Sequence, residues 1–188
     1  MNVEGLLNRA IIFAVKAHEG QKRKGSETPY ILHPLEAATI VATMTSDEML
    51  LAAAVLHDVV EDTPVTHTEI AAEFGKRVAE LVANESENKR EELPAEATWK
   101  VRKQETIEHL KTATRGVKMI TLGDKLSNIR AIHRDQLLLG DALWQRFNQK
   151  DKREHEWYYR AIADCLSELS EYEAYREYIT LINATFGE

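Results

Sequence analysis

The acidic end of one apolar segment carries residue types that could do chemistry. Residues 50–56 are all apolar and predict a helix over 47–62 that is buried on most sides. The last turns of that helix carry His57, Asp58, Glu61 and Asp62, which fall on one contiguous arc at about 100° per residue. Three crowded carboxylates repel one another and resist ionisation, and a divalent cation would neutralise them. The alternative is an exposed helix end that is simply acidic.

Two distant segments could complete such a site. His33 lies between Pro29 and Pro34, just before a predicted helix start. Asp124 and Asn128 are four residues apart in a second apolar-periodic segment, so they stack one turn apart on one helix face. A single histidine is more often packed than ligating, and an Asp–Asn pair at this spacing is usually solvated. Either segment supports a metal site only in combination with the other segment and with the acidic helix end.

The elements that would position these residues are predicted to be helices throughout. Apolar residues recur at helical spacing, no long stretch alternates as a strand would, and the chain has only 8 Gly and 4 Pro. Thr66 and Glu69 form a predicted capping box, and the Thr63-Pro64 pair ends the helix before it. Residues 19–28 and 84–98 are expected to be loops, the second one mobile. Further helices are expected over 6–15, 35–44, 99–112, 115–134, 140–147 and 151–169, and from about 171.

Composition limits the possible class of protein. The 188 residues are 44% hydrophobic and 29% charged, as in a globular chain with a full core. The net charge of −7, with acids and bases interspersed, disfavours a nucleic-acid partner. The sequence has neither a long apolar run nor a signal-peptide pattern, so no membrane association is expected. The single cysteine, Cys165, cannot form an internal disulfide, and a reducing cytoplasm is the expected location.

Three stretches together resemble a known family. They are AHEGQKRKGSETPYILHP, LLAAAVLHDVVEDT and LGDKLSNIRAI, spread over residues 17–132. Their order and separation resemble the HD-domain phosphohydrolases, and more narrowly the hydrolase domain of the RelA/SpoT family and its small stand-alone alarmone hydrolases. The resemblance implies an all-α, HD-domain helical bundle in which residues 1–188 form a single HD-type phosphohydrolase domain.

The resemblance also implies a metal centre. His33, His57, Asp58 and Asp124 fall on the family's ligands for one divalent ion, typically Mn²⁺. Two nitrogen and two oxygen ligands leave positions open for water and a phosphate oxygen, as a catalytic site requires. Glu61 and Asp62 match the acidic pair that orients or deprotonates the attacking water. Glu61 lies one turn after His57, and this spacing independently places it near the metal.

Further matches imply nucleotide binding. Arg23 matches a residue that stacks on guanine, and a planar, weakly hydrated guanidinium suits that task. Asn128 matches a nucleotide contact, while Lys24 and Lys125 belong to a predicted phosphate cradle. Other basic residues could join this cradle or be solvated surface charge; they are Lys22, Lys100, Arg102, Lys103 and Arg130. His18 also matches the family, and a structural role is favoured for it.

The predicted activity is hydrolysis of a small nucleotide. In the family, the 3′-pyrophosphate of ppGpp or pppGpp, the nucleotides of the stringent response, is removed to leave GDP or GTP. One alternative is the same chemistry on another nucleotide or phosphorylated metabolite, and a second is a non-catalytic nucleotide sensor. The chain departs from its relatives at residues 82–89. It also departs at Gly123, a position at which relatives usually carry alanine. The oligomeric state does not follow from the sequence.

Overall fold

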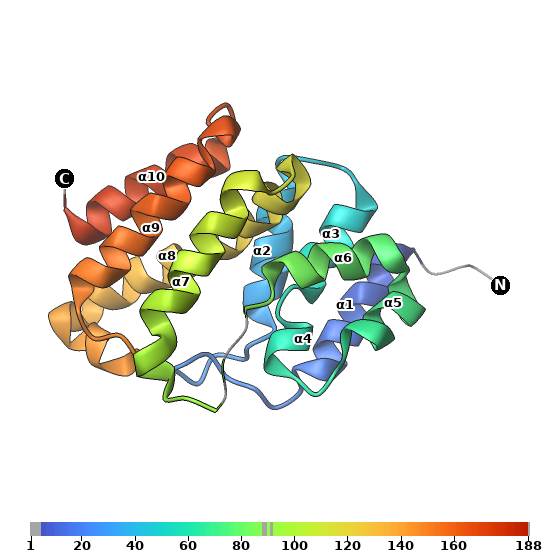
Figure 1. The fold of residues 1–188 in the computed structure, drawn as a ribbon, viewed down its shortest axis with the longest axis horizontal. Coiled ribbons are helices and arrows are strands. Elements are labelled where there is room, and N and C mark those ends of the chain that lie inside the picture. Colours follow the sequence, from blue (N-terminus) through green and yellow to red (C-terminus); the bar gives the residue numbers. More distant parts are fainter. Residues whose placement is uncertain (1–4, 88–89, 91, 188) are drawn as a thin grey trace. The chain divides into compact units, whose positions relative to one another are not determined.

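Every regular element that the structure describes is helical. This structure is a computed structural model, and it describes residues 5–87, 90 and 92–187 (Figure 1). Within those ranges the extended pairing is an isolated antiparallel bridge between Lys22 and Pro29. The predicted all-α fold class is therefore confirmed.

The helices begin and end close to where apolar periodicity places them. Their bounds are α1 Leu6–Ala17, α2 Leu32–Ala42, α3 Glu48–Leu56, α4 Val59–Asp62, α5 His67–Phe74, α6 Lys76–Glu85, α7 Ala95–Thr112, α8 Arg115–Leu139, α9 Lys152–Cys165 and α10 Glu173–Phe186. Two 3₁₀ helices, η1 and η2, cover Gly140–Arg146 and Ser167–Leu169. No described helix is both long and apolar enough to span a bilayer.

Several boundaries differ from the sequence prediction; for example, α2 begins at Leu32 rather than at 35, and α9 ends at Cys165 rather than at 169. The single helix expected over 47–62 is two helices, because the chain turns at His57 and Asp58 between α3 and α4. Helix α8 continues five residues beyond its predicted end at 134, to Leu139. The loop expected over 84–98 is shorter, since α6 includes Glu85 and α7 already begins at Ala95. Residues 88, 89 and 91 of that loop lie outside the described residues.

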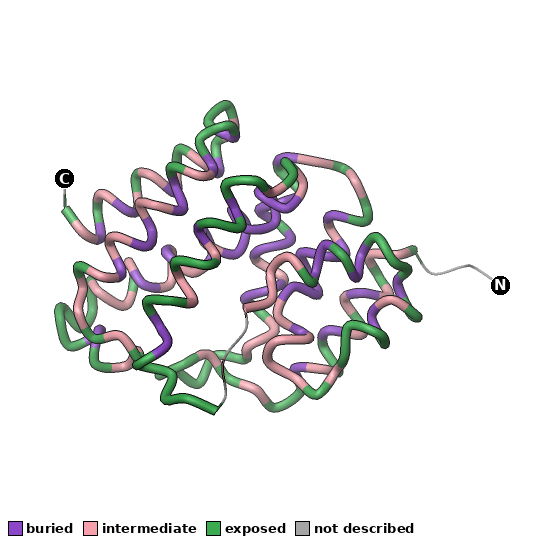
Figure 2. The backbone as a smooth tube through the Cα atoms, in the orientation of Figure 1, coloured by how far each residue is buried: buried purple, intermediate pink, exposed green. Residues whose placement is uncertain are grey.

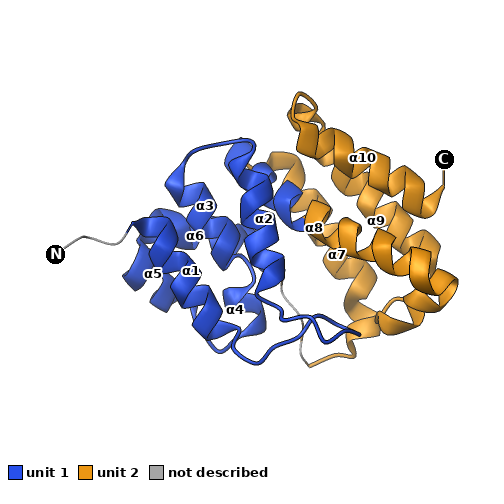
Figure 3. Cartoon of the chain, turned by 180° about the vertical axis from the view of Figure 1, so that it is seen from behind, with its two compact units in different colours: residues 1–86, 115–124 blue, residues 87–114, 125–188 orange. Residues whose placement is uncertain are grey.

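The chain divides into two compact units (Figure 3). The first unit comprises residues 1–86 and 115–124, and the second comprises residues 87–114 and 125–188. Helix α8 contributes its first part to one unit and its remainder to the other. The expectation that residues 1–188 form one functional domain stays a prediction.

The first unit is built around α3. Its residues from Ala52 to Leu56 are all fully buried, and the helix packs against α1, α2 and α6 (Figure 2). Three consecutive alanines at 52–54 present little side-chain bulk, so neighbouring helices can approach closely. The polar end of α3 is thereby held inside the unit, with helices on several sides.

Local signals fix the ends of these helices. The side chain of Asp47 accepts a hydrogen bond from the Met49 backbone N–H and caps α3. At α5 the predicted capping box is present, with Thr66 and Glu69 each accepting from the other's backbone N–H. Thr63 is extended and ends α4 immediately before Pro64, as predicted. These contacts set where the chain enters and leaves the acidic turn.

The second unit has a separate core. Helix α9 packs against α7 and α10. Ile162 and Leu166 are fully buried there, and Tyr178 and Ile182 of α10 are buried with them. The Tyr178 hydroxyl donates a hydrogen bond to the Tyr159 carbonyl oxygen at 3.2 Å, so the one polar atom of that side chain is satisfied inside the core.

Candidate metal centre and active site

The turn between α3 and α4 presents the His-Asp pair. His57 follows the last residue of α3, and its Nδ1 lies 2.8 Å from the Ala54 carbonyl oxygen. A carbonyl oxygen only accepts hydrogen bonds, so Nδ1 carries a proton and Nε2 points away from this carbonyl. Asp58 precedes the first residue of α4. The break in the helix thus orients the imidazole through one of the carbonyls at the end of α3.

Two other helices bring His33 and Asp124 to this turn. His33 lies in the first turn of α2 and Asp124 on α8, and both are buried. The two helices approach very closely at Gly123, where an added Cβ would lie 2.7 Å from the Ala37 carbonyl oxygen and 2.8 Å from Val41 Cγ2. Glycine at this position therefore allows α8 to reach α2 beside Asp124.

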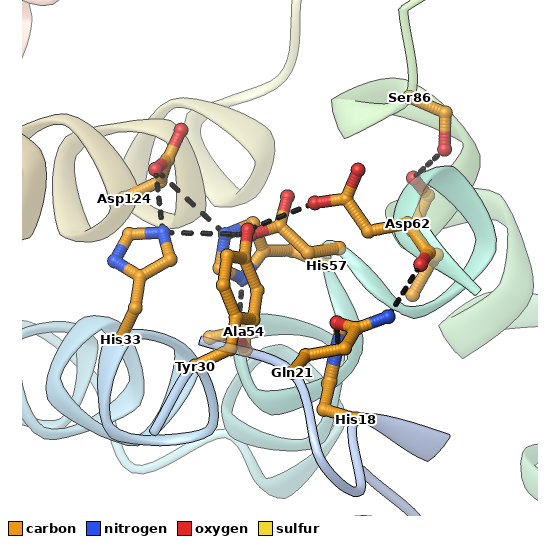
Figure 4. A network of polar contacts seen from close by, with 11 residues as sticks. His18, Gln21, Tyr30, His33, Ala54, His57, Asp62, Ser86 and Asp124 are labelled. Atoms are coloured by element: carbon orange, nitrogen blue, oxygen red, sulfur yellow. Dashed lines mark hydrogen bonds and ion pairs between the residues drawn. The ribbon is translucent and has the colours of Figure 1, made fainter. Parts of the chain in front are cut away.

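The four side chains converge, as the distances between them show, and Figure 4 labels His33, His57 and Asp124 at this point. His33 Nε2 lies 3.1 Å from Asp124 Oδ1 and 3.4 Å from Asp58 Oδ2. His57 Nε2 lies 3.0 Å from the same Asp58 oxygen and 3.7 Å from Asp124 Oδ1. Ligand atoms of His33, His57 and Asp58 all fall within 4.8 Å of one another. Segments separated by up to 91 positions in the sequence thus meet at one point.

The donor set fits a divalent cation. His57 Nε2 is buried and makes no hydrogen bond, although the Asp58 oxygen is only 3.0 Å away. A short nitrogen–oxygen distance without hydrogen-bond geometry is expected of two ligands that share one cation. Two imidazole nitrogens with carboxylate oxygens suit a first-row divalent metal. His33, His57, Asp58 and Asp124 are the residues that would hold it.

Strong electrostatic coupling characterises this cluster. Burial by itself lowers the pKa of His57, but the carboxylates of Asp58 and Asp124 outweigh it and raise that pKa well above its ordinary value. Burial by itself raises the pKa of Asp58, yet the two histidines hold it well below its ordinary value. The site therefore favours a carboxylate with a positive charge beside it, and a cation can supply that charge.

Asp62 of the acidic pair is tied to the centre by Tyr30, a residue that sequence reasoning missed. Its hydroxyl lies 2.7 Å from Asp58 Oδ2 and 2.9 Å from Asp62 Oδ2. Burial and the two carboxylate charges raise the pKa of Tyr30 above its ordinary value, so it remains a hydrogen-bond donor. Glu61 precedes Asp62 on α4 and is half-buried. The available signal was the position of Tyr30, three residues before His33 in the proline-bracketed segment.

A short loop carries Arg23 and Lys24 near this tyrosine. The loop closes on itself through the Arg23 N–H, which donates to the Thr28 carbonyl oxygen at 2.9 Å. The Arg23 guanidinium carbon lies 5.7 Å from the centroid of the Tyr30 ring, a cation–π distance. Lys24 is exposed, and Lys22 forms an ion pair with Glu27. Among the predicted nucleotide contacts in the first unit, Arg23 thus lies beside Tyr30, the residue that contacts Asp58 and Asp62.

The remaining predicted nucleotide contacts belong to the second unit. Asn128 lies one turn after Asp124 on α8 and is half-buried. Lys125 Nζ lies 5.9 Å from the centroid of the Tyr158 ring. The other cations of the predicted phosphate cradle have carboxylate partners: Arg102 and Lys103 bind Glu87, Lys100 binds Glu154, and Arg130 binds Glu177. A phosphate would have to compete with these carboxylates.

Comparison with known protein families identifies the class. The HD-domain family matches residues 10–142, which include every residue of the convergent cluster. The chain therefore belongs to the HD-domain family, and the predicted family membership is confirmed.

Individual relatives narrow the similarity to RelA/SpoT-type proteins. The chain is 36% identical over 132 residues to the GTP pyrophosphokinase rsh of Brucella melitensis, covering 69% of this chain and 17% of that protein. It is 53% identical over 76 residues to the bifunctional (p)ppGpp synthase/hydrolase SpoT of Escherichia coli K12, covering 40% of this chain and 11% of SpoT. The chain thus spans less than a fifth of the length of these curated relatives.

Two solved structures share the fold over most of the chain. One is a metazoan orthologue of SpoT described as hydrolysing ppGpp, with 25% identity, a TM-score of 0.77 and coverage of 100% of this chain and 98% of that one. The other is lmo0812 from Listeria monocytogenes EGD-e, with 32% identity and a TM-score of 0.74. That match covers 89% of this chain and 100% of the other. The similarity therefore extends beyond the family match at residue 142 to include α9 and α10.

Proposed function

We propose that this protein is a metal-dependent phosphohydrolase that removes the 3′-pyrophosphate of ppGpp or pppGpp. One observation carries the proposal: His33, His57, Asp58 and Asp124 converge with mutual distances suited to a single cation. The SpoT-type relatives and the metazoan structure supply the substrate class. Water attacks the phosphorus bonded to the 3′ oxygen, pyrophosphate departs, and the 3′ oxygen takes up a proton, which leaves GDP or GTP.

The proposed cofactor is one divalent ion, and the resemblance to the RelA/SpoT family indicates Mn²⁺. Such an ion, when bound, lowers the pKa of water and polarises a phosphoryl oxygen. The protein's own part is to hold and move the proton. Asp62 is fixed by its bond to Tyr30, and Glu61 lies beside it on α4, so this pair orients the attacking water and accepts its proton.

Substrate recognition is assigned to residues on a loop and on α8. Arg23 stacks its guanidinium on the guanine base, and in this structure the guanidinium already lies at cation–π distance from the Tyr30 ring. Lys24 and Lys125 counter phosphate charge, and Asn128 contacts the nucleotide. In this proposal residues 1–188 act as one HD-type domain.

Product analysis tests the proposed function. Purified protein with Mn²⁺ is incubated with ppGpp, and separately with GTP and GMP, and the products are separated by anion exchange. We expect GDP and intact pyrophosphate from ppGpp and no comparable turnover of the other two. Equal turnover of a mono- or triphosphate would instead support another nucleotide substrate, and no turnover of any of them would contradict the proposal.

A variant of the acidic pair separates an enzyme from a nucleotide sensor. Glu61→Gln removes the proton acceptor while conserving size, so kcat should fall about 100-fold or more with Mn²⁺ binding retained. The matched control is Glu80→Gln, because Glu80 is exposed and pairs only weakly with Lys76, four residues earlier on α6. Unchanged turnover in Glu61→Gln would exclude the proposed role of this residue.

A further inference from the structure

Tyr30 is held in place on several sides. Its ring packs against the rings of His18 and His33, with centroid distances of 5.0 and 5.9 Å. Its backbone N–H donates to the Gln21 carbonyl oxygen at 2.9 Å, and its own carbonyl oxygen accepts from the His33 N–H at 2.9 Å. The position of the hydroxyl is therefore set by the surrounding structure before any ligand arrives.

The hydroxyl contacts the oxygen of Asp58 that faces the metal centre. Asp58 Oδ2 is the atom that lies 3.0 Å from His57 Nε2 and 3.4 Å from His33 Nε2. Tyr30 approaches the same atom to 2.7 Å. A carboxylate oxygen has two lone pairs, so it can accept the phenolic hydrogen on one side and serve a cation on the other. Partners of this kind orient metal ligands.

Asp62 is fixed from the same segment by two contacts. Tyr30 reaches its carboxylate at 2.9 Å, and the Gln21 side-chain amide donates to its backbone carbonyl oxygen at 2.7 Å. Because the Gln21 nitrogen is used there, its oxygen faces His18, whose Nδ1 lies 2.8 Å away and donates to it. The buried His18 thus has the structural role that the sequence favoured, since it orients the amide that anchors Asp62.

A phenol carries one hydrogen, and this limits how Tyr30 can serve both acids. Its oxygen is within 2.9 Å of two carboxylate oxygens, yet it can donate fully to only one of them at a time. The one hydrogen is therefore shared between the two carboxylates, with the shorter contact to Asp58. The tyrosine thus links the position of the Asp58 carboxylate to that of Asp62.

We propose that Tyr30 is a positioning residue that couples the metal ligand Asp58 to the acid Asp62. This inference rests on the proposed metal-dependent hydrolysis. It adds that the segment between α1 and α2 fixes both the metal ligand and the proton acceptor, with Tyr30 as the shared contact. Tyr30 does not act on the nucleotide in this proposal, although the Arg23 guanidinium lies at cation–π distance from its ring.

The test compares Tyr30→Phe with Tyr178→Phe. Both changes remove one hydroxyl from a side chain with buried contacts, and Tyr178 lies in the second unit, where its hydroxyl binds a backbone carbonyl. Mn²⁺ affinity is measured by titration calorimetry, and folding is checked by circular dichroism and thermal unfolding. The kinetic constants kcat and KM are determined at saturating Mn²⁺. For Tyr30→Phe we expect Mn²⁺ binding about 10-fold weaker and kcat about 10- to 100-fold lower, with KM within about twofold.

Each outcome is decisive. Unchanged Mn²⁺ affinity and kcat in a folded Tyr30→Phe variant would overturn the inference, as would equal losses in Tyr178→Phe. A raised KM with unchanged kcat would also overturn it, because Tyr30 would then act with Arg23 on the nucleotide. If the wild-type protein neither binds Mn²⁺ nor hydrolyses ppGpp, the proposed function fails first, and that result is distinguishable from failure of the coupling alone.

Discussion

At the scale of single residues, His57 shows how one hydrogen bond prepares a ligand. The bond from Nδ1 to the Ala54 carbonyl oxygen fixes both the tautomer and the ring orientation, so Nε2 faces Asp58 and Asp124. An imidazole buried without this bond could present either nitrogen. Tyr30 is likewise oriented by neighbours outside the acid cluster's carboxylates, because its ring packs against the rings of His18 and His33.

Glu87 provides a prediction that is independent of the metal centre. Its carboxylate lies 2.6 Å from Lys103 Nζ and 3.0 Å from Arg102, and all three side chains are largely buried. Burial by itself raises the pKa of Glu87, but Lys103 and Lys125 outweigh it and keep that pKa below its ordinary value. A carboxylate with a lowered folded-state pKa contributes stability above its unfolded pKa of about 4.3 and loses it as pH falls through the folded value.

We therefore expect Glu87→Gln to cost about 2 kcal/mol of unfolding free energy at pH 7, because two cations lose a charged partner. The difference in unfolding free energy between the variant and the wild type should become smaller as pH falls below about 4.3. Urea unfolding at pH 7, 5 and 3.5 measures it, with Glu80→Gln as the exposed control. A difference that is the same at all three pH values would show that the charge of Glu87 is not the cause.

At the scale of elements, the site depends on how closely α8 approaches α2. An alanine in a helix interior is ordinarily about 1 kcal/mol more favourable than glycine. At Gly123 the added Cβ would meet the Ala37 carbonyl oxygen at 2.7 Å, and backbone atoms cannot move aside as a flexible side chain can. Overpacking of this kind costs about 1–3 kcal/mol, so it outweighs the propensity gain.

Gly123→Ala should thus destabilise the protein by up to about 2 kcal/mol and weaken Mn²⁺ binding, because it separates His33 from Asp124. The matched control is Gly116→Ala on the same helix, where the added Cβ would meet only the flexible end of Leu50, at 2.9 Å. Thermal unfolding and metal titration of both variants are the measurements. Tight Mn²⁺ binding by a folded Gly123→Ala variant would show that the centre tolerates a wider helix separation.

At the scale of the whole molecule, α8 belongs to both compact units. The unit boundary falls within it, directly after Asp124. A helix is cooperative along its length, so unfolding the part in one unit removes support from the part in the other. The units alternate along the chain, which prevents either from being removed by a single truncation.

This arrangement predicts that metal binding in the first unit stabilises the second. All three tryptophans, Trp99, Trp144 and Trp157, belong to the second unit, so their fluorescence reports its unfolding. The proposed ligands all belong to the first unit. With Mn²⁺ at about 100 times its Kd, the fluorescence-detected Tm should rise by about 5–10 °C if the units unfold together.

Chelation by EDTA should reverse this shift. His57→Ala is the matched control, because it removes a ligand and should abolish the response to Mn²⁺. A metal-dependent shift seen by far-ultraviolet circular dichroism but absent from tryptophan fluorescence would mean that the two units unfold separately.

The sequence by itself determined the all-α class, most helix positions, the capping box at Thr66 and the motifs that place the chain in the HD-domain family. These follow from local rules, since helical periodicity, caps and motif spacing are read along the chain. Three features required the tertiary structure: the break in the helix at His57 and Asp58, the carboxylate partners of the basic residues, and the position of Tyr30 between Asp58 and Asp62. The last two depend on atoms that meet only after distant segments pack, because packing decides which polar groups find partners.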